Sequence, residues 1–175
     1  ESGRGWVKVK GPARLEAREL TVPGDLSSAA FFLVAGAIVP GSSLVLTDVG
    51  LNPTRAALID FLVAAGADVR ILEMRMVNGE PVGDLMVKGS QLKGGVIEKA
   101  WSAALIDEIP VLAILGAVSD QGLTVRDAAE LRVKETDRIE TVASNLRLMG
   151  VRVETAEDGF HVPGGQSFRS AQVDS

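Results

Sequence analysis

The sequence predicts an α/β (α+β) fold built from a repeated unit whose helices are buried beneath its strands. Two stretches, residues 29–38 and 111–118, are apolar on every side, and a helix without a polar face must be buried. The same order of elements, helix, strand, helix, strand, strand, occurs twice. Gly66 and Gly150 end the second helix of each copy, which places the repeat at about 84 residues.

Each copy is predicted to have five elements, preceded by a short N-terminal segment. The first copy is expected to contain a helix at 29–38, a strand at 44–46, a helix begun by Asn52-Pro53 and ended by Gly66, and strands at 68–72 and 84–88 around Asn78-Gly79. The second is expected to contain a helix at 111–118, a strand at 123–125, a helix ended by Gly150, and strands at 151–154 and 159–162 joined by a turn at Asp158-Gly159. Residues 6–10 and 17–22 alternate like two strands.

Composition excludes several classes of function. The 175 residues are 46% apolar and 23% charged, which is ordinary for a globular domain, and the net charge of −5 argues against nucleic-acid binding. There is no cysteine and one histidine, so disulfides, thiolate metal sites and His-rich metal centres are excluded. No apolar run reaches the roughly 18–20 residues of a membrane span, and no secretory signal is visible. We therefore expect a cytoplasmic protein.

The charged segment at residues 131–138 is the strongest candidate for a functional site. Its sequence, L-R-V-K-E-T-D-R, holds three cations and two carboxylates where a helix is expected to begin. Lys134 and Arg138 are four residues apart and would share a helix face, with Glu135 on a neighbouring strip. Two cations at a helix N-terminus favour a phosphate or carboxylate ligand, with Glu135 held for proton transfer. A solvated first turn with an ordinary Glu–Arg pair is the alternative.

Polar residues at the starts of the buried helices are further candidates. Asp107 precedes residues 111–118, where Asp is a favoured N-cap worth about 1 kcal/mol. A role as a general base is the alternative. Glu108 suits the first turn of that helix, because a carboxylate there complements the helix dipole. Ser27 and Ser28 are expected to cap the first buried helix, with phosphate binding as the alternative.

Four segments together resemble the family of 5-enolpyruvylshikimate-3-phosphate (EPSP) synthases. Residues 130–138, E-L-R-V-K-E-T-D-R, match the family's E-L-R-V-K-E-[ST]-D-R, and residues 106–110, I-D-E-I-P, match its I-D-E-x-P. Residues 22–31, V-P-G-D-L-S-S-A-A-F, resemble V-x-G-D-x-S-S-A. Residues 51–55, L-N-P-T-R, resemble the N-P-T-R of the bacterial enzymes, especially the glyphosate-tolerant class. The segments occur in family order.

The resemblance implies a two-domain enzyme in which each domain is an inside-out barrel of three βαβαββ units, with helices buried beneath mixed sheets. Residues 1–24 would be the last strands of the first domain and the crossover. Residues 25–175 would hold two of the three units of the second domain, at about 25–90 and 105–163. We therefore expect this chain to be a piece of a longer protein.

The resemblance also implies a reaction, that of a 3-phosphoshikimate 1-carboxyvinyltransferase in aromatic amino acid biosynthesis. The enolpyruvyl group of phosphoenolpyruvate is transferred to the 5-hydroxyl of shikimate 3-phosphate and phosphate is released, without cofactor or metal. By position, Asp107 would accept the hydroxyl proton and orient the shikimate ring. Lys134 would contact the same substrate and, as a catalytic residue, assist charge movement at the reacting oxygens. Glu135 would protonate the phosphoenolpyruvate methylene and later remove a methyl proton. Arg138 would bind the phosphoenolpyruvate anion.

Several family motifs have no counterpart in this sequence. They include an N-terminal Lys and Ser, an S-[SA]-Q phosphate site and a D-H-R arginine. We therefore expect the chain alone to lack turnover and to bind substrate weakly. Two alternatives to EPSP synthase stay open at this point. One is the UDP-N-acetylglucosamine enolpyruvyl transferase, which shares the fold but does not usually carry R-V-K-E-T-D-R. The other is a non-catalytic domain that serves only folding or interaction.

Overall fold

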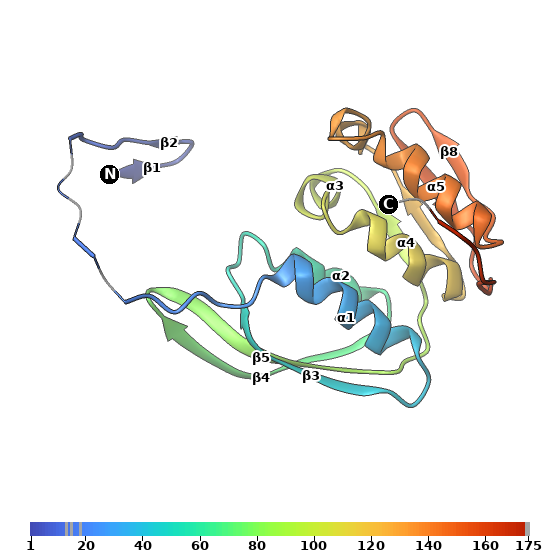
Figure 1. The fold of residues 1–175 in the computed structure, drawn as a ribbon, viewed down its shortest axis with the longest axis horizontal. Coiled ribbons are helices and arrows are strands. Elements are labelled where there is room, and N and C mark those ends of the chain that lie inside the picture. Colours follow the sequence, from blue (N-terminus) through green and yellow to red (C-terminus); the bar gives the residue numbers. More distant parts are fainter. Residues whose placement is uncertain (13, 15, 18, 174–175) are drawn as a thin grey trace.

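Two small sheets, each packed against helices, form the body of the molecule in the computed structural model (Figure 1). The structure describes residues 1–12, 14, 16, 17 and 19–173. The helices are α1 Leu26–Ile38, α2 Ala57–Ala64, α3 Ala100–Ala104, α4 Ile109–Val118 and α5 Arg138–Leu148, with a 3₁₀ helix η1 at Ala129–Val133. The strands are β1 Ser2–Gly3, β2 Trp6–Val7, β3 Ser43–Gly50, β4 Asp68–Val77, β5 Glu80–Lys88, β6 Gly95–Ile97, β7 Leu123–Val125, β8 Glu154–Ala156 and β9 Gly159–Val162.

The two sheets repeat one topology. The first has the order β3-β5-β4 and is antiparallel. The second is mixed and has the order β6-β7-β9-β8, with β6 parallel to β7 and the other pairs antiparallel. In the first unit a parallel bridge between Gly24 and Val49 takes the place of the β6–β7 pair. The repeat predicted from the sequence is confirmed, and each copy gains a strand or bridge before its first helix.

The two units also have residues with left-handed backbone conformation at equivalent positions. Gly66 and Gly150 end α2 and α5 in the left-handed conformation, with φ of 95° and 86°. The N–H of Ala67 donates to the Leu62 carbonyl, and that of Val151 to the Leu146 carbonyl, both at 2.9 Å. Each bond provides a partner for a carbonyl in the last turn of the helix. Asp48 and Asp127 are left-handed as well, with φ of 60° and 54°. The N–H of Asp48 donates to Asp84 in β5 at 3.0 Å, and the N–H of Asp127 donates to Asp158 in the turn between β8 and β9 at 2.9 Å.

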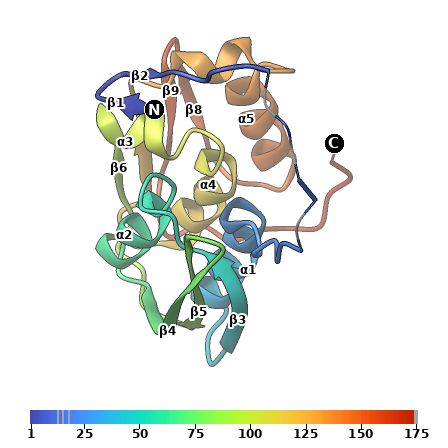
Figure 2. The same ribbon diagram turned by 90° about the vertical axis from the view of Figure 1, so that its left-hand side faces the viewer.

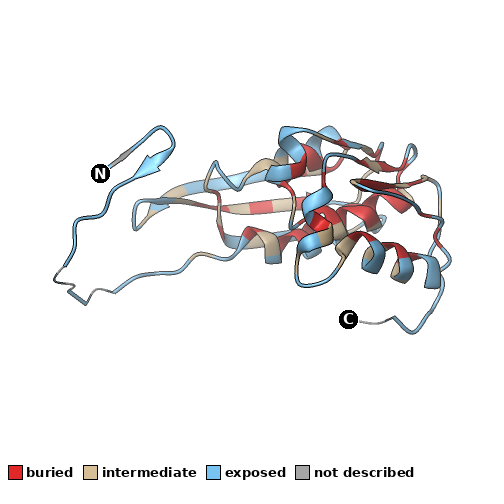
Figure 3. Cartoon of the chain, turned by 90° about the horizontal axis from the view of Figure 1, so that it is seen from above, coloured by how far each residue is buried: buried red, intermediate tan, exposed pale blue. Residues whose placement is uncertain are grey.

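Helices α1 and α4 pack against each other between the two sheets and form the centre of the core (Figure 2). Leu33 in α1 and Leu112 in α4 are fully buried. Figure 3 shows the buried residues concentrated in these helices and in the strand faces against them. The expectation of helices buried beneath mixed sheets is therefore confirmed. One side of α1 is open, however, because Phe31 and Phe32 are 63% and 59% exposed.

The predicted helix starts are wrong at several positions. Asn52 does not cap α2, which begins at Ala57. Its Oδ1 accepts the Thr54 N–H at 3.1 Å and closes a separate turn. The N-cap of α1 is Asp25, whose carboxylate accepts the Ser28 N–H at 2.7 Å, rather than either serine. In each case a residue type that often begins helices lies near the helix start, but another residue occupies the N-cap position, Asp25 in α1 and Ala56 in α2.

Other differences concern short elements. Both hairpins are present, but the predicted strand at 151–154 is wrong, because β8 is Glu154–Ala156. The second hairpin therefore turns at residues 157 and 158 rather than at Asp158-Gly159. The sequence did not predict β6, α3 or η1, which are three to five residues long. Near the N-terminus, β2 pairs with β1, and residues 17 and 19–22 are not a strand. Residue 18 of that predicted strand lies outside the described residues.

The N-terminal segment extends away from the body of the molecule (Figures 1 and 3). Its apolar side chains are exposed, including Val7, Val9 and Val22. Within the described part of the chain, no helix is long and apolar enough to cross a membrane.

A close approach of α4 to β7 gives a testable prediction about stability. A Cβ at Gly116 would lie 2.4 Å from Leu123 Cβ and 3.1 Å from its backbone N, so one of the elements would have to move. Gly116→Ala is expected to lower the free energy of unfolding by about 1–3 kcal/mol, despite the better helix propensity of Ala. Urea denaturation monitored by circular dichroism measures this change.

Gly95→Ala is the matched control for this prediction. A Cβ there would meet only Phe61 ring atoms at 3.7–3.8 Å, which is an ordinary contact distance. It should change the free energy of unfolding by no more than about 0.5 kcal/mol. Equal effects of the two substitutions would contradict the packing described for α4 and β7.

Candidate active site

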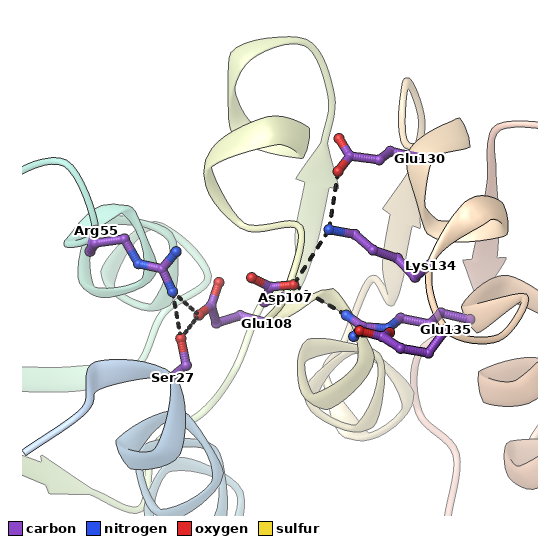
Figure 4. A network of polar contacts seen from close by, with 8 residues as sticks. Ser27, Arg55, Asp107, Glu108, Glu130, Lys134 and Glu135 are labelled. Atoms are coloured by element: carbon purple, nitrogen blue, oxygen red, sulfur yellow. Dashed lines mark hydrogen bonds and ion pairs between the residues drawn. The ribbon is translucent and has the colours of Figure 1, made fainter. Parts of the chain in front are cut away.

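The turn that joins α3 to α4 carries two consecutive carboxylates that face in opposite directions (Figure 4). Glu108, not Asp107, occupies the N-cap position of α4, and its side chain makes no capping hydrogen bond. The predicted cap role of Asp107 is therefore wrong, and so is the first-turn position of Glu108. The Asp107 side chain is 40% exposed and is directed toward the charged segment of the second unit.

The charged segment does not form one continuous helix. Residues up to Val133 form η1, Lys134 is extended with φ −74° and ψ −162°, and α5 begins at Arg138. Asp137 is the N-cap of α5 and accepts the Glu140 N–H at 3.1 Å. The prediction that Lys134 and Arg138 share one helix face is therefore wrong, because residues 134–137, of which Lys134 is extended, separate η1 from α5.

Both cations nevertheless reach the same carboxylate. Arg138 Nη1 donates to Asp107 Oδ1 at 3.1 Å, and Lys134 Nζ lies 3.9 Å from the same oxygen. The turn with Asp107 and the charged segment at residues 131–138, about 30 residues apart in the sequence, thus lie side by side in the second unit (Figure 4). Three of the residues predicted to form the site, Asp107, Lys134 and Arg138, are brought together by the fold.

Two further carboxylates complete the group. Arg138 Nη2 donates to Glu135 Oε2 at 2.8 Å, and Lys134 Nζ lies 3.0 Å from Glu130 Oε1. No role was predicted for Glu130 from the sequence, although its i,i+4 spacing from Lys134 is typical of an ion pair. Two cations face three carboxylates, so each cation is paired on two sides. To bind an anionic ligand, Lys134 or Arg138 would have to exchange one of its carboxylate partners for that ligand.

The same contacts set the ionisation of Glu135. Its own backbone N–H, and then the hydrogen bond and charge of Arg138, lower the pKa of the Glu135 carboxyl below its ordinary value. The side chain is 77% exposed. In this arrangement Glu135 is a carboxylate at neutral pH, and it becomes a proton donor only where its environment raises its pKa.

Arg132, the remaining cation of the charged segment, anchors the backbone. Its Nη1 donates to Asp137 Oδ2 at 2.6 Å, and its Nε donates to the Glu157 carbonyl at 2.6 Å. These bonds tie η1 to the start of α5 and to the β8–β9 turn. Arg132 therefore holds the segment that carries Lys134 and Arg138, without itself contacting Asp107 in the structure.

A second polar cluster lies on the other side of the turn, around Glu108. Ser27 Oγ donates to Glu108 Oε1, and Arg55 Nη2 donates to Ser27 Oγ at 2.9 Å. Ser28 Oγ donates to the Asp25 carboxylate at 2.8 Å. Both serine hydroxyls are thus engaged by protein groups, which does not favour the alternative of phosphate binding there. The sequence reading missed the cluster, because 81 residues separate Ser27 from Glu108.

The site can bind an anion and move protons at neighbouring positions. Lys134 and Arg138 are suited to stabilise developing negative charge, and three carboxylates, of which Asp107 and Glu135 were predicted from the sequence, lie within contact distance of them. No group of three or more acidic or His side chains within the described residues is arranged to hold a metal ion. A cavity of about 520 Å³ lies elsewhere, between α2 and α3, where Phe61 packs edge-on against Trp101.

Comparison with known proteins identifies what this arrangement resembles. A sequence model described as EPSP synthase (3-phosphoshikimate 1-carboxyvinyltransferase) matches residues 1–175. A 3-phosphoshikimate 1-carboxyvinyltransferase of Solibacter usitatus is 55% identical over 99% of this chain, and one of Geobacter metallireducens is 48% identical over all of it. The chain spans 41% of the length of each relative.

A solved structure agrees with the sequence comparisons. The EPSP synthase of Acinetobacter baumannii superposes with a TM-score of 0.80 at 42% identity, covering 85% of this chain and 34% of that chain. Fold and sequence thus point the same way. This chain belongs to the EPSP synthase family.

Proposed function

We propose that this chain supplies part of the active site of a 3-phosphoshikimate 1-carboxyvinyltransferase. The observation that carries the proposal is the meeting of the I-D-E-I-P segment with the charged segment, through Asp107 Oδ1 and Arg138 Nη1 at 3.1 Å. Relatives that are about half identical carry that enzyme's name, which does not favour the UDP-N-acetylglucosamine transferase or a non-catalytic domain. Because the chain spans 39–41% of the length of these relatives, the complete reaction requires the rest of the enzyme.

The proposed reaction joins the 5-hydroxyl oxygen of shikimate 3-phosphate to C2 of phosphoenolpyruvate. Asp107 accepts the hydroxyl proton as the new C–O bond forms, and Glu135 gives a proton to the methylene carbon. Glu135 then removes a proton from the resulting methyl group as phosphate leaves, and the proton taken up by Asp107 passes to the departing phosphate, so both carboxyl groups return to their starting protonation states. Lys134 contacts the shikimate substrate, and Arg138 binds the phosphoenolpyruvate anion.

The contacts of Arg138 support a change in the role of Glu135 when substrate binds. Arg138 holds Asp107 and Glu135 together, and an anion that takes up the Arg138 guanidinium would weaken both contacts. Loss of the hydrogen bond from Arg138 to Glu135, and the negative charge of the bound anion, would raise the pKa of Glu135. Binding of the substrate would therefore favour the protonated form of Glu135, although the hydrogen bond from its own backbone N–H, the largest cause of the lowered pKa, would remain.

The proposal includes the domain organisation implied by the resemblance. Residues 1–24 would belong to the first domain and its crossover, and residues 25–175 would hold two of three units of the second, at about 25–90 and 105–163. The exposed apolar side chains of the N-terminal segment and of Phe31 and Phe32 support this division, because parts of a longer chain would cover them. The partners would be the two substrates and the remainder of the enzyme. A cytoplasmic location, consistent with a chain that lacks cysteine, is part of the same proposal.

The first prediction concerns turnover in a protein of the relatives' full length that contains this chain. Glu135→Gln and Asp107→Asn are each expected to lower kcat by about 10²- to 10⁴-fold, because each removes a proton-transfer group. Phosphate release with both substrates, and detection of the enolpyruvyl product by mass spectrometry, measure this loss.

The control for that assay is Glu154→Gln, which removes an exposed carboxylate on β8 and should retain the parent's rate. The 175-residue chain alone should show no turnover. Full activity of Glu135→Gln, or turnover by the isolated chain close to that of the longer protein, would overturn the assignment of the site.

A second prediction concerns the pKa of Glu135. Because the pKa is lowered, the carboxylate stays charged to lower pH, and removing a cause of the lowering moves protonation to higher pH. Arg138→Ala is expected to raise the titration midpoint only in part, since the largest cause is the backbone N–H of Glu135 itself. Carbon-13 NMR of the Glu135 carboxyl between about pH 2 and 7 follows the change.

Arg70→Ala is the control for the titration. Arg70 pairs with Asp68 in the first unit at 2.8 Å and makes no described contact with Glu135, so the Glu135 midpoint should not move. An unchanged midpoint in Arg138→Ala would mean that the Arg138–Glu135 hydrogen bond is not formed in solution.

A further inference from the structure

The buried carboxylate of Glu108 is not used by the proposed mechanism. The residue is only 7% exposed, and it is one of the few polar residues in an otherwise apolar core. A carboxylate is stable in such a position only when it is paired and hydrogen-bonded. Its neighbour Asp107 faces the other way, toward Lys134 and Arg138 (Figure 4).

The partners of Glu108 all come from the first unit. Ser27, in the first turn of α1, donates its hydroxyl hydrogen to Glu108 Oε1. Arg55, in the loop between β3 and α2, donates to Ser27 Oγ at 2.9 Å, and its Nη2 lies 3.9 Å from Glu108 Oε1. The Ser27 hydroxyl thus connects Arg55 to the Glu108 carboxylate through two hydrogen bonds. This cluster joins the first unit to the turn of the second unit that carries Asp107.

The backbone of the turn passes this connection on to Asp107. The N–H groups of Glu108 and Ile109 both donate to the Leu105 carbonyl at 2.9 Å, and the Glu108 carbonyl accepts from Leu112 at 3.0 Å. Leu105, Ile109 and Leu112 are fully buried. The turn is therefore short and closed, and a shift of Glu108 moves Asp107 with it.

From these contacts we infer that Glu108 is a positioning residue for Asp107. Its contacts with Ser27 and Arg55 hold the turn where Asp107 Oδ1 stays within reach of Arg138 and Lys134. The inference rests on the proposed role of Asp107 as proton acceptor. Glu108 itself touches no reacting atom, so its effect on the reaction passes entirely through its neighbour.

The test is a double-mutant cycle in the full-length protein that contains this chain. Glu108→Ala is expected to lower kcat by about 10- to 100-fold, because an acceptor displaced by about 1 Å loses its alignment. The KM values for shikimate 3-phosphate and phosphoenolpyruvate should change far less than kcat. Glu108→Gln keeps an oxygen that can accept the Ser27 hydrogen bond, so it should recover most of the rate.

The decisive variant combines Glu108→Ala with Asp107→Asn. If Glu108 acts through Asp107, adding Glu108→Ala to Asp107→Asn lowers kcat by no more than about twofold further. Multiplication of the two losses would overturn the inference. Glu98→Ala is the control, since it removes a carboxylate of the same unit that pairs with Lys99 and Arg126 at 3.3 and 3.9 Å, and it should retain the rate.

Two measurements keep the inference separate from folding and from the proposed function. If Glu108→Ala does not fold, Ser27→Ala replaces it in the same cycle, with the same expected dependence on Asp107. If the parent protein does not turn over the two substrates, the proposed function is overturned, and a crystal structure of the Glu108→Ala or Ser27→Ala variant then decides the positioning role. An Asp107 carboxylate still 3.1 Å from Arg138 Nη1 would overturn it, and a displaced one would support it.

Discussion

The contact between α1 and α4 is the constraint on which the rest of this structure depends. Both helices are apolar on all sides, and each unit's sheet can cover only one side of its own helix. The helices therefore cover each other, and the two units become one body around a common core. This packing also brings the start of α1 to the turn before α4, as the hydrogen bond from Ser27 to Glu108 shows. The position of the site follows from the position of the core.

Much of the fold could be predicted because its strongest signals are local and periodic. A few neighbouring residues are enough to predict some elements. These are the buried helices from their apolar runs, the ends of α2 and α5 from their glycines, and the first hairpin turn from Asn78-Gly79. Helix starts were predicted less well. Asn52 and Asp107 are residue types that begin helices, but tertiary contacts decide where such a residue is used. Elements of three to five residues, such as β6 and α3, are too short to show a period.

The candidate site divides in the same way. Asp107, Lys134, Glu135 and Arg138 were assigned through motif resemblance, and the structure connects all four through hydrogen bonds and ion pairs. The expected helix across residues 134–138 is absent, because Asp137 caps α5 and leaves Lys134 extended. The Glu108 cluster could not be predicted, since it joins side chains from three places in the sequence that only the packing of α1 on α4 brings together.

The internal repeat gives a physical reason for the opposed directions of Asp107 and Glu108. In each unit, the loop between the strand after the first helix (β3 or β7) and the second helix (α2 or α5) carries at least one cation. This loop supplies Arg55 in the first unit, and Lys134 in the second, with Arg138 at the start of α5. Because the units pack side by side through α1 and α4, both loops approach the same turn, from opposite sides (Figure 4). Two consecutive carboxylates can then each meet a cation of a different unit, which no single side chain could do. The buried carboxylate of Glu108 connects the two units, and the more exposed carboxylate of Asp107 is the one for which we propose a role in proton transfer.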